Sequence, residues 1–237
     1  MNVSLVCRLL IAFVGLIVCH QSHAQTCLGL TFKPGMSYEL LSYTAKDKPN
    51  GKLTYTIKEA RREGANTVIE LEFQMIDEKG KSQVNPSVVR YTCTGTEMIA
   101  DLSGMMNASA GSLKNSEVRM KTNQLVYPTK LVSNVKLPDG LLESELYTDG
   151  NKMMDMTISM ANRQVGGQES ITVPAGTYNA WKITSDSEMK NRVMGMGLPA
   201  FRMQTISYRT DDVLMDIRTE TYRNGKLMGY IVLNKIN

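Results

Sequence analysis

The stretch Ile69-Glu70-Leu71-Glu72-Phe73-Gln74-Met75 alternates apolar and polar side chains at every step. A period of two places alternate side chains on opposite faces of a β-strand, so that one face is buried and the other is wet. The pattern returns in Met154-Asp155-Met156-Thr157-Ile158-Ser159-Met160 and in Val213-Leu214-Met215-Asp216-Ile217-Arg218. All three stretches therefore predict strands of an antiparallel sheet.

Turn signals separate these stretches. Asn50-Gly51, Asp149-Gly150 and Asn224-Gly225 favour two-residue hairpins, because both central positions of such turns need a positive φ. Val173-Pro174-Ala175-Gly176 fits a type I turn. The spacing predicts roughly ten strands joined mostly to sequence neighbours. The expected fold class is all-β, with a curved antiparallel sheet that forms a partly open barrel or a two-sheet sandwich.

Three segments interrupt the strand pattern. Residues 102–114 are rich in Ser, Gly, Ala and Met and predict one short helix near the sheet. Tyr127–Leu142 contains Pro and Gly with few strand formers, and is expected to cross between the two groups of strands. Met189–Phe201 predicts a loop or an irregular edge. We expect a single β-rich domain over 25–237, with two halves at about 25–126 and 143–237 as the alternative.

Residues 1–24 resemble a secretory signal peptide. Arg8 supplies the positive region, Leu9 to Val18 form a short apolar region, and Ser22-His23-Ala24 has the small residues of a cleavage site. Cys19 gives a weaker lipoprotein alternative, because a small residue precedes a lipidated cysteine and Val18 is not small. The segment predicts export from the cytoplasm.

The chain has 2 histidines, His20 and His23, and both lie in the predicted signal. The processed chain would therefore lack the usual general base and the usual metal ligand. Carboxylate pairs such as Glu70/Glu72 lie on the polar faces of strands, and solvated carboxylates keep near-normal pKa values. We expect no catalytic residues, no metal site and no cofactor.

Charge and hydropathy limit the partners. The formal charge of +4 is small, and Lys58, Arg61 and Arg62 are interleaved with Glu59 and Glu63. Nucleic-acid binding usually requires clustered cations with aromatic partners, so no nucleic-acid partner is expected. No apolar run after residue 24 reaches the ~18 residues of a membrane helix, so no transmembrane segment is expected.

Two cysteines remain after the predicted signal. An even pair in an oxidising compartment predicts a disulfide between Cys27 and Cys93. The alternative is two buried free thiols.

Methionine is the unusual residue of this chain, with 17 copies. Met is flexible and polarisable, and it adapts to irregular apolar shapes. We consider ordinary core packing, the lining of a site for an apolar ligand, and copper(I) binding, for which the strand-like spacing gives little support. Trp181 is either a core anchor or part of the same lining. The candidate ligand-lining residues are Met154, Met156, Met160, Trp181, Met194, Met196 and Met203.

The order of several motifs resembles a known family. After Cys27 come Pro34-Gly35-Met36-Ser37-Tyr38-Glu39 and Tyr91-Thr92-Cys93, and then Thr172-Val173-Pro174-Ala175-Gly176-Thr177-Tyr178 and Tyr222-Arg223-Asn224-Gly225-Lys226-Leu227. This order resembles the TapB-like secreted proteins of Bacteroidetes and the domain-of-unknown-function 3108 family of envelope proteins. The resemblance implies an all-β exported protein in the periplasm or on the outer-membrane or extracellular side of a Gram-negative bacterium. It implies no chemistry.

Together these observations favour a non-catalytic envelope protein that binds an apolar, lipid-like or extended ligand. The first alternative is a scaffold that binds another envelope protein, and the second is a hydrolase that uses carboxylates. A binding site of the first kind would require an apolar cavity of at least ~300 Å³.

Overall fold

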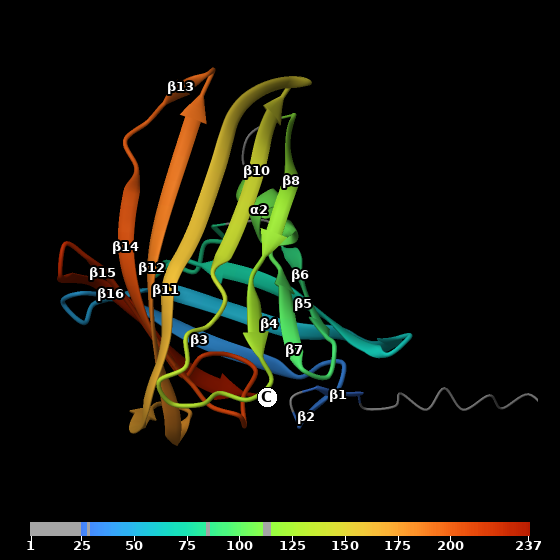
Figure 1. Ribbon diagram of the computed structural model, residues 1–237, viewed down its shortest axis with the longest axis vertical. Helices are drawn as coiled ribbons and strands as arrows, with labels where there is room; N and C mark the ends of the chain where they lie inside the picture. Colours follow the sequence, from blue (N-terminus) through green and yellow to red (C-terminus); the bar gives the residue numbers. More distant parts are fainter. Residues whose placement is uncertain (1–24, 28, 84–85, 111–114) are drawn as a thin grey trace, which may run out of the picture.

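The computed structural model describes residues 25–27, 29–83, 86–110 and 115–237, and it is an all-β protein (Figure 1). The predicted signal peptide, 1–24, lies outside the described residues. One sheet of 14 strands dominates the fold, and a second sheet contains only β1 and β2. Every strand pair is antiparallel, which confirms the fold class expected from the period-two pattern.

The elements follow one another in the order of the sequence. The first part of the chain forms β1 (Gln25–Cys27), β2 (Leu30–Phe32), β3 (Ser37–Thr44), β4 (Pro49–Glu63), β5 (Asn66–Ile76), β6 (Ser87–Cys93), β7 (Glu97–Asp101) and α2 (Ser103–Ala110). The remainder forms β8 (Ser116–Gln124), β9 (Val126–Pro128), β10 (Gly140–Thr148), β11 (Asn151–Val173), β12 (Gly176–Val193), β13 (Met196–Gly197), β14 (Phe201–Arg209), β15 (Arg218–Arg223) and β16 (Lys226–Ile236).

The sheet curls until its two ends nearly meet. Its order is β8-β10-β11-β12-β14-β15-β16-β3-β4-β5-β6-β7-β9, so the last strand pairs with β3 and joins the two halves of the sequence. The end strands β8 and β9 are separated in the chain only by Leu125. The Ala100 N–H donates to the Leu125 carbonyl at 3.0 Å, which continues the β7–β9 pairing up to the end of β8. Of the two expected architectures, the structure is the partly open barrel.

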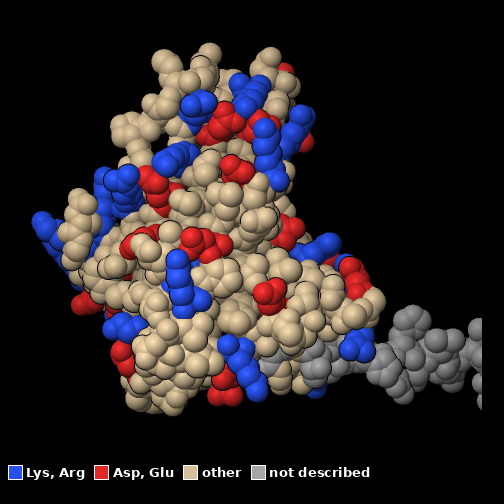
Figure 2. Space-filling model, in the orientation of Figure 1, with Lys and Arg blue, Asp and Glu red and all other residues tan. Residues whose placement is uncertain are grey.

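Strand length gives the molecule its uneven shape. The strands β8, β10, β11, β12 and β14 rise well beyond the N-terminal strands, which cross them lower down (Figure 1). In the space-filling view these strands form a narrower upper part above a broad base (Figure 2). The upper part is therefore a projecting sheet, and the base is the closed part of the barrel.

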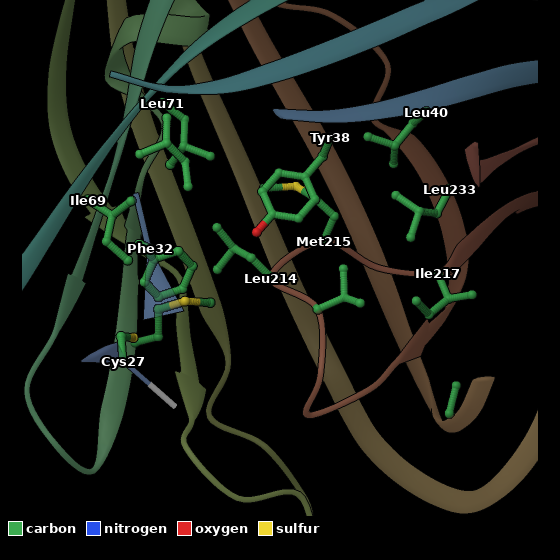
Figure 3. Close-up of a cluster of buried hydrophobic side chains, with 14 of the residues drawn as sticks. Cys27, Phe32, Tyr38, Leu40, Ile69, Leu71, Leu214, Met215, Ile217 and Leu233 are labelled. Atoms are coloured by element: carbon green, nitrogen blue, oxygen red, sulfur yellow. The ribbon is translucent and has the colours of Figure 1, made fainter. Parts of the chain in front are cut away.

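The main core fills the base. It combines Phe32, Tyr38 and Ile69 from the N-terminal strands with Leu214 and Ile217 from the other half (Figure 3). Burial of such side chains contributes about 1.5–3 kcal/mol each to folding. The core therefore holds the two walls of the barrel together.

The predicted strand at Val213–Arg218 is wrong. Residues 210–217 form an irregular segment instead, and Val213, Leu214, Met215 and Ile217 are all buried in the core. Leu214 was expected on a wet face. The alternation is broken because this segment enters the barrel and is surrounded by apolar side chains on every side.

Two of the predicted hairpin turns are confirmed. Asp149 and Asn224 each adopt a φ of 50°, and the glycine that follows each of them also has a positive φ. The turn predicted at Asn50-Gly51 is wrong, because the chain reverses before Pro49, with Asp47 at a φ of 57°. Gly51 lies within β4, where a Cβ would collide with the carbonyl oxygen of Ile76.

The predicted helix near 102–114 is α2, Ser103–Ala110, and residues 111–114 lie outside the described part. The Ser103 N–H donates to Asp101 Oδ1 at 2.9 Å, which satisfies one of the free donors at the helix start. The helix contacts β6 and β8. Gly104 allows this approach, since a Cβ there would collide with the Val88 carbonyl.

The expected disulfide is present. Cys27 of β1 and Cys93 of β6 are bonded, with their Cα atoms 5.9 Å apart and 66 residues between them in sequence. Both cysteines are buried at the edge of the main core. The bond therefore fixes the short N-terminal β-hairpin to the barrel.

Replacing both cysteines by alanine is expected to lower the free energy of unfolding by about 3–4 kcal/mol, because the open loop regains chain entropy in the unfolded state. Urea unfolding followed by circular dichroism measures the change. The unmodified protein in reductant should behave like the double variant. Equal stability of the oxidised protein and the variant would contradict the prediction.

Candidate functional site

The inner face of the projecting sheet carries most of the candidate methionines. In β11, Met154, Met156 and Met160 alternate with outward-facing polar residues. Cross-strand partners share a face, and Met156 lies beside Ser144 of β10 and Asn191 of β12. The face includes Val118, Met120, Leu142, Leu146, Met154, Met156, Ile158, Met160, Met189, Val193, Phe201 and Met203.

This inner methionine face is only half-buried. Apart from Leu142, its large apolar side chains keep intermediate exposure. None of them belongs to the main core or to the smaller second cluster formed by Leu137, Val165 and Ile183. Ser144, Ser187 and Asn191 lie among these apolar side chains. A group of partly exposed apolar side chains marks a site of interaction more often than a single scattered one does.

The other candidate residues lie elsewhere. Trp181 is on the same face but lower, where it packs against Ile183 in the second cluster. Its indole nitrogen is buried and has no hydrogen-bond partner among the described residues. Met194 and Met196 lie at the exposed upper end of β12 and β13. The structure therefore groups Met154, Met156, Met160 and Met203, and it separates Trp181, Met194 and Met196 from them.

The outer face of the same sheet is charged (Figure 2). It contains a groove of about 580 Å³ that includes Glu143, Glu145 and Thr157 among its lining residues. Lys121 and Lys152 each place Nζ 2.7 Å from Glu145 Oε1. The charged side chains of this groove therefore line its wall together with Met156 and Leu198.

The electrostatics of this groove do not favour acid–base chemistry. Hydrogen bonds from Lys121 and Lys152 lower the pKa of Glu145 to about 2. Tyr147 also donates to Glu145, at 3.1 Å. A carboxylate with so low a pKa is a poor proton donor or acceptor near neutral pH. Thr122 donates to Glu143 at 2.6 Å, so the neighbouring carboxylate is also engaged.

A cavity with both polar and apolar walls lies inside the barrel, and sequence reasoning did not predict it. Its volume is about 190 Å³, and Tyr55, Tyr91, Tyr127, Arg209 and Asp216 contribute to its lining. Burial raises the pKa of Tyr55 to about 12 and also raises the pKa values of Tyr91 and Tyr127. These phenols are neutral near pH 7. The cavity is smaller than the ~300 Å³ typical of ligand pockets.

Two buried arginines stack on Tyr127. The guanidinium carbon of Arg163 lies 4.7 Å from the ring centroid, and that of Arg209 lies 4.6 Å from it. Arg163 donates to the carbonyls of Val126 and Pro138 at 2.9 and 2.6 Å. Arg163 is therefore engaged by two carbonyls and the Tyr127 ring. Arg209 is engaged by the same ring, by the Leu214 carbonyl and by Asp216.

Among the residues that the structure describes, no three His, Cys, Asp or Glu side chains gather as metal ligands. The helix that the structure describes is not long and apolar enough to cross a membrane.

These features define a class: a barrel-like, all-antiparallel protein with a projecting sheet that is apolar on one face and charged on the other. The DUF3108-like family matches residues 33–233, and the chain belongs to this family. The match extends from before β3 into β16. The family resemblance seen in the motifs is confirmed.

Two solved structures share the fold. One is a candidate exported protein with a YmcC-like fold from Bacteroides fragilis, 20% identical, with a TM-score of 0.65 over 86% of this chain and 96% of that chain. The other is a candidate lipoprotein from Parabacteroides distasonis, 19% identical, with a TM-score of 0.66 over 90% of this chain and 100% of that chain. The comparison with curated proteins gives no match.

The Glu145 ion pairs generate a pH prediction. The folded state holds the pKa of Glu145 at about 2, against an ordinary value of 4.5. The resulting stabilisation is present above pH 4.5 and is lost as the pH falls toward 2. At pH 7 the Glu145→Gln variant should therefore have a lower free energy of unfolding than the unmodified protein. Near pH 2 the two free energies should become equal.

Urea unfolding across this pH range measures the effect. Glu143→Gln is the matched control, because Glu143 lies two residues away on the same face and bonds to a threonine instead of lysines. Its pH dependence should follow that of the unmodified protein more closely. If the stability difference between Glu145→Gln and the unmodified protein did not change with pH, the stabilisation of ionised Glu145 by Lys121 and Lys152 would be contradicted.

Proposed function

We propose that this protein is an exported, non-catalytic cell-envelope protein that binds one extended apolar ligand, an acyl chain, on the inner methionine face. The single observation that carries the proposal is the half-buried apolar surface across five strands that belongs to neither core cluster.

Export is supported by independent features. Residues 1–24 have the pattern of a secretory signal, and the Cys27–Cys93 disulfide suits an oxidising compartment. The two proteins of similar fold are described as an exported protein and a lipoprotein. A location in the periplasm or on the outer side of the envelope follows from this reading.

The chemistry of the inner face supports an acyl chain. In β11 the inward positions between Met154 and Met160 are apolar, and this stretch spans about 20 Å of extended strand. Flexible thioether side chains adapt to a chain without a fixed shape. Beside this stretch, the charged residues Asp155, Glu188 and Lys190 point to the other face, where they would not oppose an apolar ligand.

A binding role is favoured over hydrolysis by the state of the polar groups. Glu145 is held ionised by two lysines, and Arg209 is occupied by Tyr127, Leu214 and Asp216. With both histidines in the predicted signal, the processed chain offers no imidazole to activate a serine. We therefore assign no catalytic residue.

A pair of double variants tests the site. Met156→Gln with Met189→Gln makes the inner face polar, whereas Thr157→Gln with Lys190→Gln changes adjacent positions on the outer face. The inner variant should bind a fluorescent fatty acid about tenfold more weakly, because polar amides oppose burial of an apolar chain. The outer variant should bind as the unmodified protein does.

Circular dichroism and thermal unfolding establish that both variants fold. Native mass spectrometry of protein purified from the envelope should reveal a bound lipid. Absence of fatty-acid binding by the unmodified protein would overturn the proposal. A stoichiometric protein in place of a lipid would instead favour a scaffold in the envelope.

A further inference from the structure

We propose that the upper end of β12 and β13 is a membrane-docking tip, which inserts its apolar side chains into the surface of a lipid bilayer that contains anionic headgroups. The tip consists of Met194, Met196 and Leu198. This inference does not depend on the acyl-chain site proposed above.

The tip exposes large apolar side chains close together. Met194 is 72% exposed, Met196 is 70% exposed and Leu198 is 51% exposed. Glycines separate them in the sequence Met194-Gly195-Met196-Gly197-Leu198. The tip lies at the top of the projecting sheet in Figure 1, far from the base. A flat surface could therefore approach it without touching the barrel.

The backbone at Met194 is an independent observation. Its φ is 47°, in the left-handed region that is unfavourable for residues with a Cβ. Asn and Asp tolerate this region because their short polar side chains bond locally. In the described part of the chain, the other non-glycine residues with positive φ are all Asn or Asp: Asp47, Asn115, Asn134, Asp149, Asn162 and Asn224.

The turn therefore keeps methionine where the rest of the chain uses a polar residue. Met194 and Gly195 occupy the same positions as Asp149-Gly150 and Asn224-Gly225 in two other two-residue hairpins. Asparagine would suit the backbone better and would leave no apolar group exposed. An observed strain of this kind points to a role for the side chain itself.

The tip is held in place by the neighbouring strands. The Met194 N–H donates to the Met153 carbonyl at 3.0 Å, and the Leu198 N–H donates to the Asn191 carbonyl at 2.8 Å. A preorganised tip loses little conformational entropy on insertion.

The charges beside the tip favour an anionic membrane surface. Between Met189 and Arg202 the chain has three cations, Lys190, Arg192 and Arg202, and no acidic residue. Glu188 pairs with Lys190 and Arg202, and Asp155 pairs with Lys152. Arg192 forms no ion pair with the described residues. Its guanidinium group can meet a phosphate as the apolar side chains enter the bilayer.

Flotation with vesicles of phosphatidylethanolamine and phosphatidylglycerol tests the proposal on the protein purified from the envelope. Met194→Asn should weaken binding about tenfold, because one exposed apolar side chain is no longer transferred out of water. The same variant should unfold at an equal or higher temperature, since Asn-Gly is the preferred turn. Loss of binding in a protein at least as stable cannot be ascribed to misfolding.

Asn224→Met is the reciprocal control, because it places a methionine at the same backbone position of a different hairpin. It should lower stability and leave vesicle binding unchanged. Arg192→Gln should weaken binding to vesicles with phosphatidylglycerol more than binding to vesicles of phosphatidylcholine alone.

The outcomes separate the two proposals. The variant with Met156→Gln and Met189→Gln should lose the fatty acid but still float with vesicles. Unchanged vesicle binding by Met194→Asn, or no binding by the unmodified protein, overturns the docking tip. A dimer in light scattering that Met194→Asn dissociates would also overturn it, because the tip would then be a contact between copies.

Discussion

The fold depends on how the ends of its sheet are joined where the backbone ladder stops. Tyr127 of β9 comes from one end, and its ring receives the guanidinium groups of Arg163 from β11 and Arg209 from β14. Two buried charges would be costly if they were unpaired. Here Arg163 donates to two carbonyls, and Arg209 donates to the Leu214 carbonyl and contacts Asp216. The side chains thus perform across the seam the role that backbone hydrogen bonds perform elsewhere.

This closure also explains why the barrel interior is filled. Arg209 holds the segment of residues 210–217 inside the base, and Leu214 and Ile217 complete the core against Tyr38. Little room remains, and the cavity beside Arg209 has only about 190 Å³. The projecting strands, outside the closed part of the barrel, therefore offer the acyl chain proposed above more room than this cavity does. The same long strands that carry the inner methionine face also lift the docking tip away from the base.

The sequence predicts those parts of this fold that depend on local pattern. Period-two alternation correctly identifies β5 and β11, and the even cysteine pair correctly predicts the disulfide. Alternation fails at Leu214, because a segment inserted into a core is buried on all sides and no longer has a wet face. The turn at Asn50-Gly51 fails because the glycine is required by the close approach of Ile76 within the sheet. Arg163 and Arg209 resemble ordinary surface arginines in the sequence, since their burial depends on strands far apart in the chain.

The two faces of the projecting sheet place opposite demands on its residues. A half-exposed apolar face next to unpaired strand edges invites association with other sheets. In the edge strand β8, the outward positions are Glu117, Arg119 and Lys121, and charged side chains of this kind oppose edge-to-edge pairing. On the inner face, methionine fills space without fixing one shape, which is the property that the proposed acyl-chain site requires. Leucine or isoleucine would pack more firmly but would hold a single arrangement. A sheet with charge on one face and methionine on the other is therefore suited to remaining soluble while it presents an apolar surface.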